Sequence, residues 1–254
     1  MNIAGKICVI TGAASGIGKA LAHRFAAEQA RLVIAADRDG EGAKATAAEV
    51  NGAAFTADVS EEDDIALLID SVERDHGPID LFFSNAGIGL GGGAEAPNEA
   101  WQKIWDINVM AHVWAARHMI PRMIARGGGY MVSTASAAGL LSQIGSAPYA
   151  VTKHAAVALA EWLAITHGDD GIKVSVLCPQ AVRTAMTAGN PDGVASIDGM
   201  IEPEDVAEAC VKAIAAETFL ILPHPEVLDY MRRKTGDYDR WLSGMRKLNR
   251  RFRG

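Results

Sequence analysis

The sequence predicts an α/β fold: a doubly wound parallel sheet of about seven strands in a single domain, with a short helical C-terminal extension. Short apolar runs alternate with stretches of helical periodicity along the chain. The runs stay apolar without alternating, as expected for strands that are covered on both faces. No low-complexity linker or change in composition divides the chain. Such strand and helix alternation predicts right-handed crossovers, with helices on both sides of the sheet.

The elements follow from apolar periodicity and from the turn residues between them. The predicted strands span residues 6–11, 31–37, 53–57, 79–84, 129–135, 172–178 and 218–222. The predicted helices span residues 16–28, 40–50, 61–76, 98–126, 147–167 and 203–216. Segments 87–93 and 180–202 follow strands but are too irregular for core elements. Loops at the carboxyl ends of strands form the ligand crevice of an open parallel sheet, so we expect both segments to line a site.

Composition excludes several classes of protein. No apolar run among the 254 residues approaches the ~20 residues of a membrane-spanning helix. The first residues run into the first strand without the pattern of a secretory leader, and the net charge of −7 argues against nucleic-acid binding. Cys8, Cys178 and Cys210 lack the spacing of zinc or redox motifs, and the seven histidines are scattered. We therefore expect a cytoplasmic protein with buried thiols and no metal, which binds neither nucleic acid nor a membrane.

The end of the chain differs from the rest. We expect residues 1–222 to form the main domain and residues 223–254 a helical extension, which carries nine Lys/Arg and four Asp/Glu. Apolar side chains recur in it at helical spacing: Val227, Leu228, Met231, Tyr238, Trp241, Leu242, Met245 and Leu248. Packing against the core or another subunit is the favoured interpretation. A lid over the substrate loop, or an arm that binds a partner, is the alternative.

A glycine-rich turn joins the first strand to the first helix. It contains Gly12, Ser15, Gly16, Ile17 and Gly18. Glycines allow backbone N–H groups and a helix N-terminus to approach a pyrophosphate, which makes the turn a candidate dinucleotide site and the fold Rossmann-type. A turn that only packs the helix on the sheet is the alternative.

Residues after the next strands extend this candidate site. Asp37 ends the second strand about twenty residues after the turn, as in dinucleotide motifs, and its carboxylate would bind ribose hydroxyls and repel a 2′-phosphate. NAD is therefore the predicted cofactor, and NADP, held through Arg38, the alternative. Asp58 and Val59 after the third strand are placed to contact adenine and line the cleft, although Asp58 has a helix cap as its alternative role. Asn85, Ala86 and Gly87 follow the fourth strand in the same way.

Tyr149 and Lys153 stand four residues apart, on one face of the predicted helix 147–167. A tyrosine has an ordinary pKa of ~10, which is too high for easy proton exchange at neutral pH. The positive charge of Lys153 would favour the phenolate, so Tyr149 is a candidate acid/base. A pair on an exposed helix face is the alternative.

These motifs together make residues 5 to about 222 resemble the short-chain dehydrogenase/reductase family. The resemblance rests on Thr11-Gly12-x-x-x-Gly16-x-Gly18, Asn85-Ala86-Gly87, Asn108, Ser136 and Tyr149-x-x-x-Lys153. It implies that Ser136 hydrogen-bonds the substrate oxygen, that Tyr149 is the catalytic acid/base, and that Lys153 binds the nicotinamide ribose and lowers the tyrosine pKa. Asn108 would hold a water that relays protons from Lys153. An amide that satisfies neighbouring backbone is the alternative for Asn108.

The segment after the sixth strand departs from the family pattern, because Pro179-Gln180 stands where Pro-Gly is usual, so that the glycine is replaced. By the resemblance, Pro179, Val182 and Thr184 lie beside the cofactor, while Gln180 is a candidate to face the substrate. The predicted substrate pocket contains Gln143, Ile144, Gln180, Ala181 and Met186. These side chains indicate an uncharged alcohol or ketone of some bulk.

We therefore expect an oxidoreductase that transfers a hydride between a nicotinamide cofactor and a secondary alcohol or ketone. The family implies a homodimer or homotetramer. The alternative is a non-catalytic regulator of the same fold that senses dinucleotides, although Ser136, Tyr149 and Lys153 together argue against it. A sugar-nucleotide epimerase or dehydratase would need a larger C-terminal domain than this extension.

Overall fold

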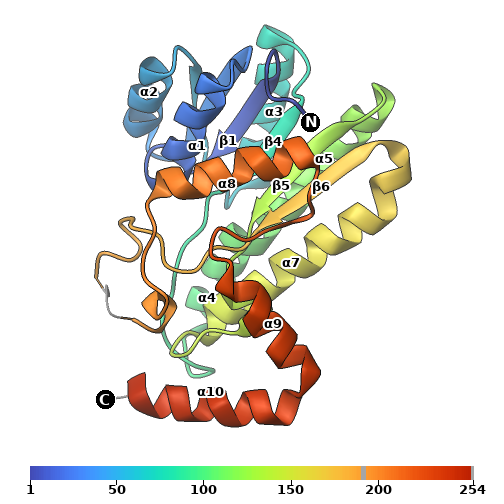
Figure 1. The fold of residues 1–254 in the computed structure, drawn as a ribbon. Helices are drawn as coiled ribbons and strands as arrows, with labels where there is room; N and C mark the ends of the chain where they lie inside the picture. The colour runs from blue at the N-terminus through green and yellow to red at the C-terminus, as the bar shows by residue number, and fades with distance from the viewer. Residues whose placement is uncertain (190–192, 253–254) are drawn as a thin grey trace.

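The computed structural model describes residues 1–189 and 193–252, so residues 190–192 of the predicted loop 180–202 lie outside the described part. A seven-stranded parallel sheet forms the centre, in the order β3-β2-β1-β4-β5-β6-β7 (Figure 1). Its strands are β1 Ile7–Thr11, β2 Leu32–Asp37, β3 Ala53–Thr56, β4 Leu81–Ser84, β5 Gly129–Thr134, β6 Ile172–Leu177 and β7 Leu220–Ile221. The order reverses between β1 and β4, which is where open parallel sheets bind ligands.

Helices cover both faces of the sheet. The helices are α1 Gly16–Ala27, α2 Gly40–Glu49, α3 Glu62–His76, α4 Asn98–Trp105, α5 Ala111–Ala125, α6 Ala138–Leu141, α7 Ala147–His167, α8 Pro203–Ala216, α9 Glu226–Gly236 and α10 Tyr238–Phe252. A π-helical turn, Asp106–Met110, connects α4 to α5. Short 3₁₀ turns occur at Gly168–Asp170 and Val194–Ser196.

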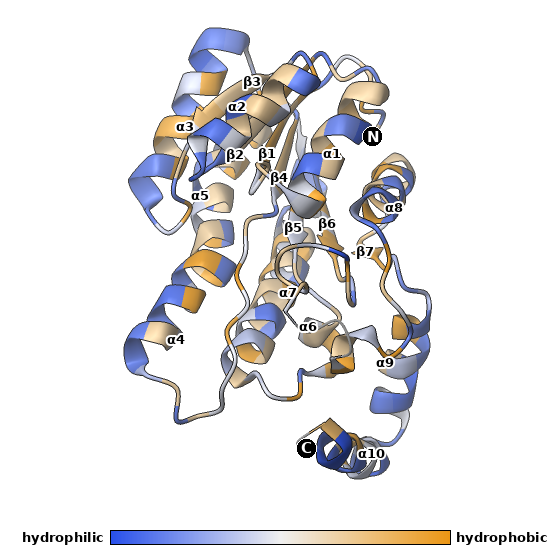
Figure 2. Ribbon diagram, turned by 90° about the vertical axis from the view of Figure 1, so that its left-hand side faces the viewer, coloured by the Kyte–Doolittle hydropathy of each residue, from blue (hydrophilic) through white to orange (hydrophobic). Residues whose placement is uncertain are grey.

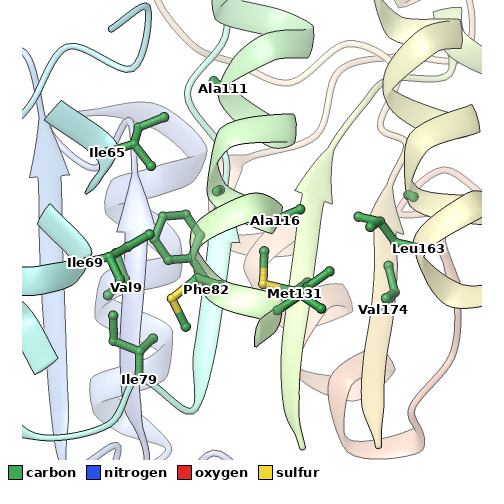
Figure 3. Packing of buried hydrophobic residues seen from close by; sticks show 14 of the residues in the cluster. Val9, Ile65, Ile69, Ile79, Phe82, Ala111, Ala116, Met131, Leu163 and Val174 are labelled. Carbon is green, nitrogen blue, oxygen red and sulfur yellow. The ribbon is translucent and has the colours of Figure 1, made fainter. Parts of the chain in front are cut away.

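The two faces of β1 show why the strands are largely apolar. Ile7 and Val9 pack with α3, α5 and α7, whereas Cys8 and Ile10 pack with α1 and α8 on the opposite face. Figure 3 shows the first of these cores, where strand and helix side chains interdigitate around Phe82. Successive strand residues point to opposite faces, so a strand with helices on both sides has apolar neighbours on both faces.

The structure confirms the predicted fold class, with its helical C-terminal extension. The predicted helix 98–126 is present but is interrupted by the π turn. Helix α9 packs on α6, and α10 packs on α9 at the end of the molecule away from the sheet (Figures 1 and 2). No helix in the described ranges combines the length and apolar character that a membrane crossing requires.

Candidate active site

One large cavity opens at the carboxyl ends of the strands. Its volume is about 1730 Å³, which exceeds the roughly 300–1,000 Å³ typical of a single small-molecule site. The predicted cofactor residues all line it: Gly12, Ser15, Gly16, Ile17, Gly18, Asp37, Arg38, Asp58, Val59, Asn85, Ala86, Gly87, Tyr149, Lys153, Pro179, Val182 and Thr184. So do Ser136 and the predicted pocket residues Gln143, Ile144, Gln180, Ala181 and Met186. The cavity has room for a dinucleotide and a second molecule.

The glycine turn is packed too closely for side chains. A Cβ on Gly18 would lie 2.1 Å from the carbonyl oxygen of Gly12, and one on Gly12, where φ is +68°, would lie 2.8 Å from the Cα of Ala86. Glycine at these positions therefore brings the turn against the start of α1 and leaves its backbone open to the cavity. The turn has the form of a pyrophosphate cradle.

Asp37 fixes this turn as well as facing the cavity. Its carboxylate accepts hydrogen bonds from the backbone N–H of Ala14 (3.0 Å) and of Asp39 (3.0 Å). The side chain is thus held at the edge of the cavity beside the glycine turn. A negative charge at this position disfavours an additional phosphate on the ribose.

Asp58 and Asn85 have structural roles within the cavity wall. The Asp58 carboxylate accepts from the N–H (2.9 Å) and the hydroxyl (2.7 Å) of Ser60, and these bonds lower its pKa. Ser60 precedes α3, whose N-cap is Glu61, so the Asp58 side chain orders the turn before the helix and does not cap it. The Asn85 amide donates to the carbonyl of Thr11 (3.0 Å) and accepts from the Thr134 hydroxyl (3.1 Å). Asn85 therefore ties the ends of β1, β4 and β5 together.

Tyr149 and Lys153 face one another along α7. The Lys153 amine lies 5.7 Å from the centre of the Tyr149 ring and donates to the carbonyl of Thr134 (2.9 Å). Lys153 is only 3% exposed, and burial lowers its pKa to about 8. Burial raises the pKa of Tyr149, and a hydrogen bond with Ser136 opposes this rise. The direction is opposite to the expected lowering by Lys153, because removing the phenolate from water outweighs the other effects.

Ser136 lies beside Tyr149 in the cavity wall. Its hydroxyl accepts from the N–H of Ala138 (3.1 Å) and donates to the carbonyl of Pro179 (3.3 Å). The nearby hydroxyl of Thr134 points to Asn85 instead. The side chains of Ser136 and Tyr149 thus meet at one wall of the cavity.

Asn108 does not line the cavity. It is fully buried in the π turn, where its amide donates to the carbonyl of Ile88 (3.0 Å) and accepts from the N–H of Ile88 (2.9 Å). The Asn108 amide therefore satisfies neighbouring backbone groups, as in the alternative interpretation. Turns of π-helix recur at functional sites. A Cβ on Gly87 would lie 3.2 Å from the Asn108 amide oxygen and 3.3 Å from the Lys153 amine. Gly87 therefore lets Asn108 and Lys153 converge, and a role for Asn108 in proton relay stays a prediction.

The loop after β6 holds Gln180 at the edge of the cavity. Its backbone N–H donates to His224 Nδ1 (3.2 Å), and its side-chain amide donates to Asp198 (3.0 Å). The hydroxyl of Tyr230 donates to the same Asp198 carboxylate (2.8 Å). Sequence reasoning did not find this connection between the loop and α9. No local pattern could have shown it, since the contacts join segments that are distant in the chain.

Comparisons with known proteins agree with this geometry. The family model described as short chain dehydrogenase matches residues 6–194. The chain is 34% identical to human epidermal retinol dehydrogenase 2, over 91% of this chain and 77% of the relative. It is 35% identical to 1-deoxy-11-beta-hydroxypentalenate dehydrogenase of Streptomyces exfoliatus, over 96% and 92%.

Solved structures show the same likeness. A short-chain dehydrogenase/reductase from Burkholderia phymatum in complex with NAD superposes with a TM-score of 0.86 at 30% identity, over 94% of this chain and 96% of that one. A 3-ketoacyl-(acyl-carrier-protein) reductase from Brucella melitensis complexed with NADH gives 0.79 at 29% identity, over 87% and 96%. The chain therefore belongs to the short-chain dehydrogenase/reductase family and is a nicotinamide-dependent oxidoreductase that acts on alcohols or ketones.

Proposed function

We propose that the protein interconverts a bulky, largely apolar secondary alcohol and its ketone, with NAD as the preferred cofactor. The observation that supports this most directly is that Ser136 and Tyr149 share one cavity with the glycine turn and Asp37. The relatives include enzymes named for retinol and for hydroxypentalenate, which are both bulky molecules. The apolar lining provided by Ile144 and Met186 suits such a molecule.

The chain's own side chains account for the proton transfer. When bound, the nicotinamide ring accepts or gives the hydride, and its oxidised form adds a positive charge to the site. In the direction of oxidation, Tyr149 takes the hydroxyl proton while Ser136 holds the substrate oxygen. Lys153, anchored on the Thr134 carbonyl, is placed to bind the cofactor ribose and supports the phenolate by its charge. Reduction reverses these steps.

The preference for NAD rests on Asp37. Its carboxylate lies in the cavity beside the glycine turn, where the extra phosphate of NADP would meet a like charge. Arg38 lines the same part of the cavity and is the residue through which NADP would bind. We expect Asp37→Asn to reduce the preference for NADH over NADPH, and Arg38→Ala to leave that preference in place. An unchanged ratio of NADH to NADPH affinity in Asp37→Asn would contradict this assignment.

The decisive experiment is turnover by wild type and by Tyr149→Phe. NADH and NADPH binding is followed by fluorescence titration, and a panel of ketones and alcohols by nicotinamide absorbance. We expect kcat to fall by at least about a hundredfold in Tyr149→Phe, with cofactor affinity retained. Tight binding without turnover by the wild-type protein on the whole panel would favour the dinucleotide-sensing regulator.

We further propose that the protein is a homodimer or homotetramer built on α7. Val151, Trp162 and Ile165 share one face of this helix by periodicity, and their side chains are 47%, 56% and 83% exposed. Large apolar residues grouped in this way usually mark an interface. Light scattering should therefore give a multiple of 26.8 kDa for the wild type and a smaller mass for Trp162→Glu with Ile165→Glu. A cytoplasmic location stays a prediction.

A further inference from the structure

Helix α10 forms part of the wall of the cavity that contains Tyr149 and Ser136. Its residues Trp241, Met245 and Leu248 line this cavity, and their i, i+4, i+7 spacing places them on one face of the helix. Trp241, Met245 and Leu248 are partly buried, and Trp241 packs against the cluster of Ala137, Leu141 and Val227. The apolar face of α10 is thus directed at the active site.

Other parts of the cavity wall are apolar as well. Leu141 and Ile144 come from the segment before α7, and Met186 and Ile197 from the loop after β6. Leu141 is buried in the cluster against which Trp241 packs, whereas Met186 is 55% exposed and Ile197 is 48% exposed. Incompletely buried apolar side chains of α10 and of this loop therefore line one cavity. They would gain from contact with an apolar molecule bound in it.

Hydrogen bonds fix the helices of this outer wall to the rest of the molecule. The Lys234 amine at the end of α9 donates to the carbonyl of Leu140 (2.6 Å). Asp198 accepts from both Tyr230 of α9 (2.8 Å) and Gln180 (3.0 Å). The position of α10 is therefore defined through α9, on which it packs.

Two guanidinium groups line the same cavity. Arg233 lies over the ring of Tyr230, 5.8 Å from its centre, and Arg240 begins the cavity-facing side of α10. Within residues 1–189 and 193–252, neither has a carboxylate within ion-pair distance, whereas Arg183 of the nearby loop pairs with Glu202 (2.7 Å). The neighbouring carboxylate of Asp237 accepts from the backbone N–H of Arg240 (2.9 Å). Guanidinium groups placed in this way favour an oxyanion, carboxylate or phosphate.

We propose that α10 is the outer wall of the substrate site: Trp241, Met245 and Leu248 hold the apolar body of a substrate whose far end carries an oxyanion that faces Arg233 and Arg240. This inference rests on the proposed function, because it assigns the reacting carbon to Tyr149 and Ser136. It narrows the substrate class to bulky or extended alcohols and ketones with an acidic group remote from the carbinol. It also differs from the uncharged substrate that the residues of the predicted pocket indicate.

A ladder of methyl ketones tests the charged end. The probes are ω-carboxylated methyl ketones of increasing chain length, each compared with its methyl ester and with the matching ω-phosphate monoester. We expect kcat/KM to favour the carboxylate or the phosphate over the ester by about threefold to tenfold once the chain is long enough to reach the two arginines. The preferred anion identifies the source of the oxyanion. Arg233→Gln and Arg240→Gln should remove this preference, while Arg246→Gln, which does not line the cavity, should keep it.

A second pair of variants tests the apolar wall. Trp241→Ala should raise KM for the long ketones with little change in kcat, and it should leave the shortest ketone unaffected. Leu242→Ala is the matched control, because Leu242 is on the same helix but does not line the cavity. A change in oligomer mass in Trp241→Ala would show that a second copy of the chain covers this face, and would overturn the proposal.

These experiments distinguish failure of the oxyanion site from failure of the proposed function. If no anion is preferred at any chain length, or if the preference survives both arginine exchanges, the oxyanion site is wrong although ketone reduction continues. If no ketone of any length is reduced and Tyr149→Phe changes nothing, the proposed function itself fails. A preference for the anionic ketones that depends on Arg233 and Arg240, together with the higher KM of Trp241→Ala for long ketones, would establish α10 as the outer wall of the substrate site.

Discussion

His112 should make the stability of this protein depend on pH. It lies in α5, four residues after Asn108, and is 2% exposed. Neither ring nitrogen has a hydrogen-bond partner in the described part of the chain. Burial lowers its pKa to about 3, and the nearby positive charge of Lys153 acts in the same direction. The folded protein therefore holds this ring neutral at a pH where an unfolded chain would protonate it.

The size of the effect follows from the two pKa values. In an unfolded chain a histidine has a pKa of ~6.5, so above that value the ring is neutral in both states and adds no pH dependence. Below it, the unfolded chain binds a proton that the folded chain does not, and the free energy of unfolding falls by about 1.4 kcal/mol for each pH unit. This loss continues until the folded pKa of about 3 is reached. At about pH 4.5, it amounts to about 2.7 kcal/mol.

Urea unfolding of wild type and His112→Leu between about pH 8 and about pH 4.5, at one fixed protein concentration, measures this contribution. The free energy of unfolding of the wild type should fall relative to the variant by about 2.7 kcal/mol across this range. The exchange His76→Leu, at the exposed end of α3, is the matched control outside the core. A wild-type minus His112→Leu difference that does not vary with pH would refute the reasoning from burial.

Three further predictions follow from close contacts and buried hydrogen bonds. Gly87→Ala places a carbon 3.2 Å from the Asn108 amide oxygen and 3.3 Å from the Lys153 amine, so kcat should fall by about tenfold or more at an unchanged urea midpoint. Gly18→Ala places a carbon 2.1 Å from a backbone carbonyl of the glycine turn. Calorimetry should show a loss of about 1 to 3 kcal/mol in the free energy of unfolding, and fluorescence titration should show weaker NADH binding. Tyr130→Phe removes a buried hydroxyl bond of 2.8 Å to β6 and should lower the free energy of unfolding by about 1 kcal/mol without affecting kcat.

The fold could be predicted from the sequence because its signals are local. The strands are largely apolar, and α7 begins and ends at the predicted residues, after Ser146 and before Gly168. The π turn Asp106–Met110 could not be predicted in this way. No glycine or proline marks the change in register, and Asn108 within the turn hydrogen-bonds both the N–H and the carbonyl of Ile88. That contact spans two separate segments of the chain.

The candidate site likewise contains some residues that local spacing predicts and others that only the three-dimensional structure brings together. Tyr149 and Lys153 were found because one helix sets their spacing, and the glycine turn because its motif is continuous. The outer wall depends on contacts such as Lys234 with Leu140, which are 94 residues apart in sequence. The apolar spacing of the C-terminal extension predicted that it must be covered, but the three-dimensional arrangement was needed to place Trp241 beside the cavity.

The environment of Lys153 links the stability of the fold to its function. A pKa lowered to about 8 by burial means that folding disfavours the charged amine by about 3 kcal/mol at neutral pH. Within the described part of the chain, the carbonyl of Thr134 is the one hydrogen-bond acceptor that this amine has. An apolar side chain of similar length would fill the same space without this cost, so packing does not explain a lysine here. The residue is explained if the amine acts on a ligand in the adjoining cavity, where a bound ribose would supply the hydrogen-bond acceptors that the folded chain does not.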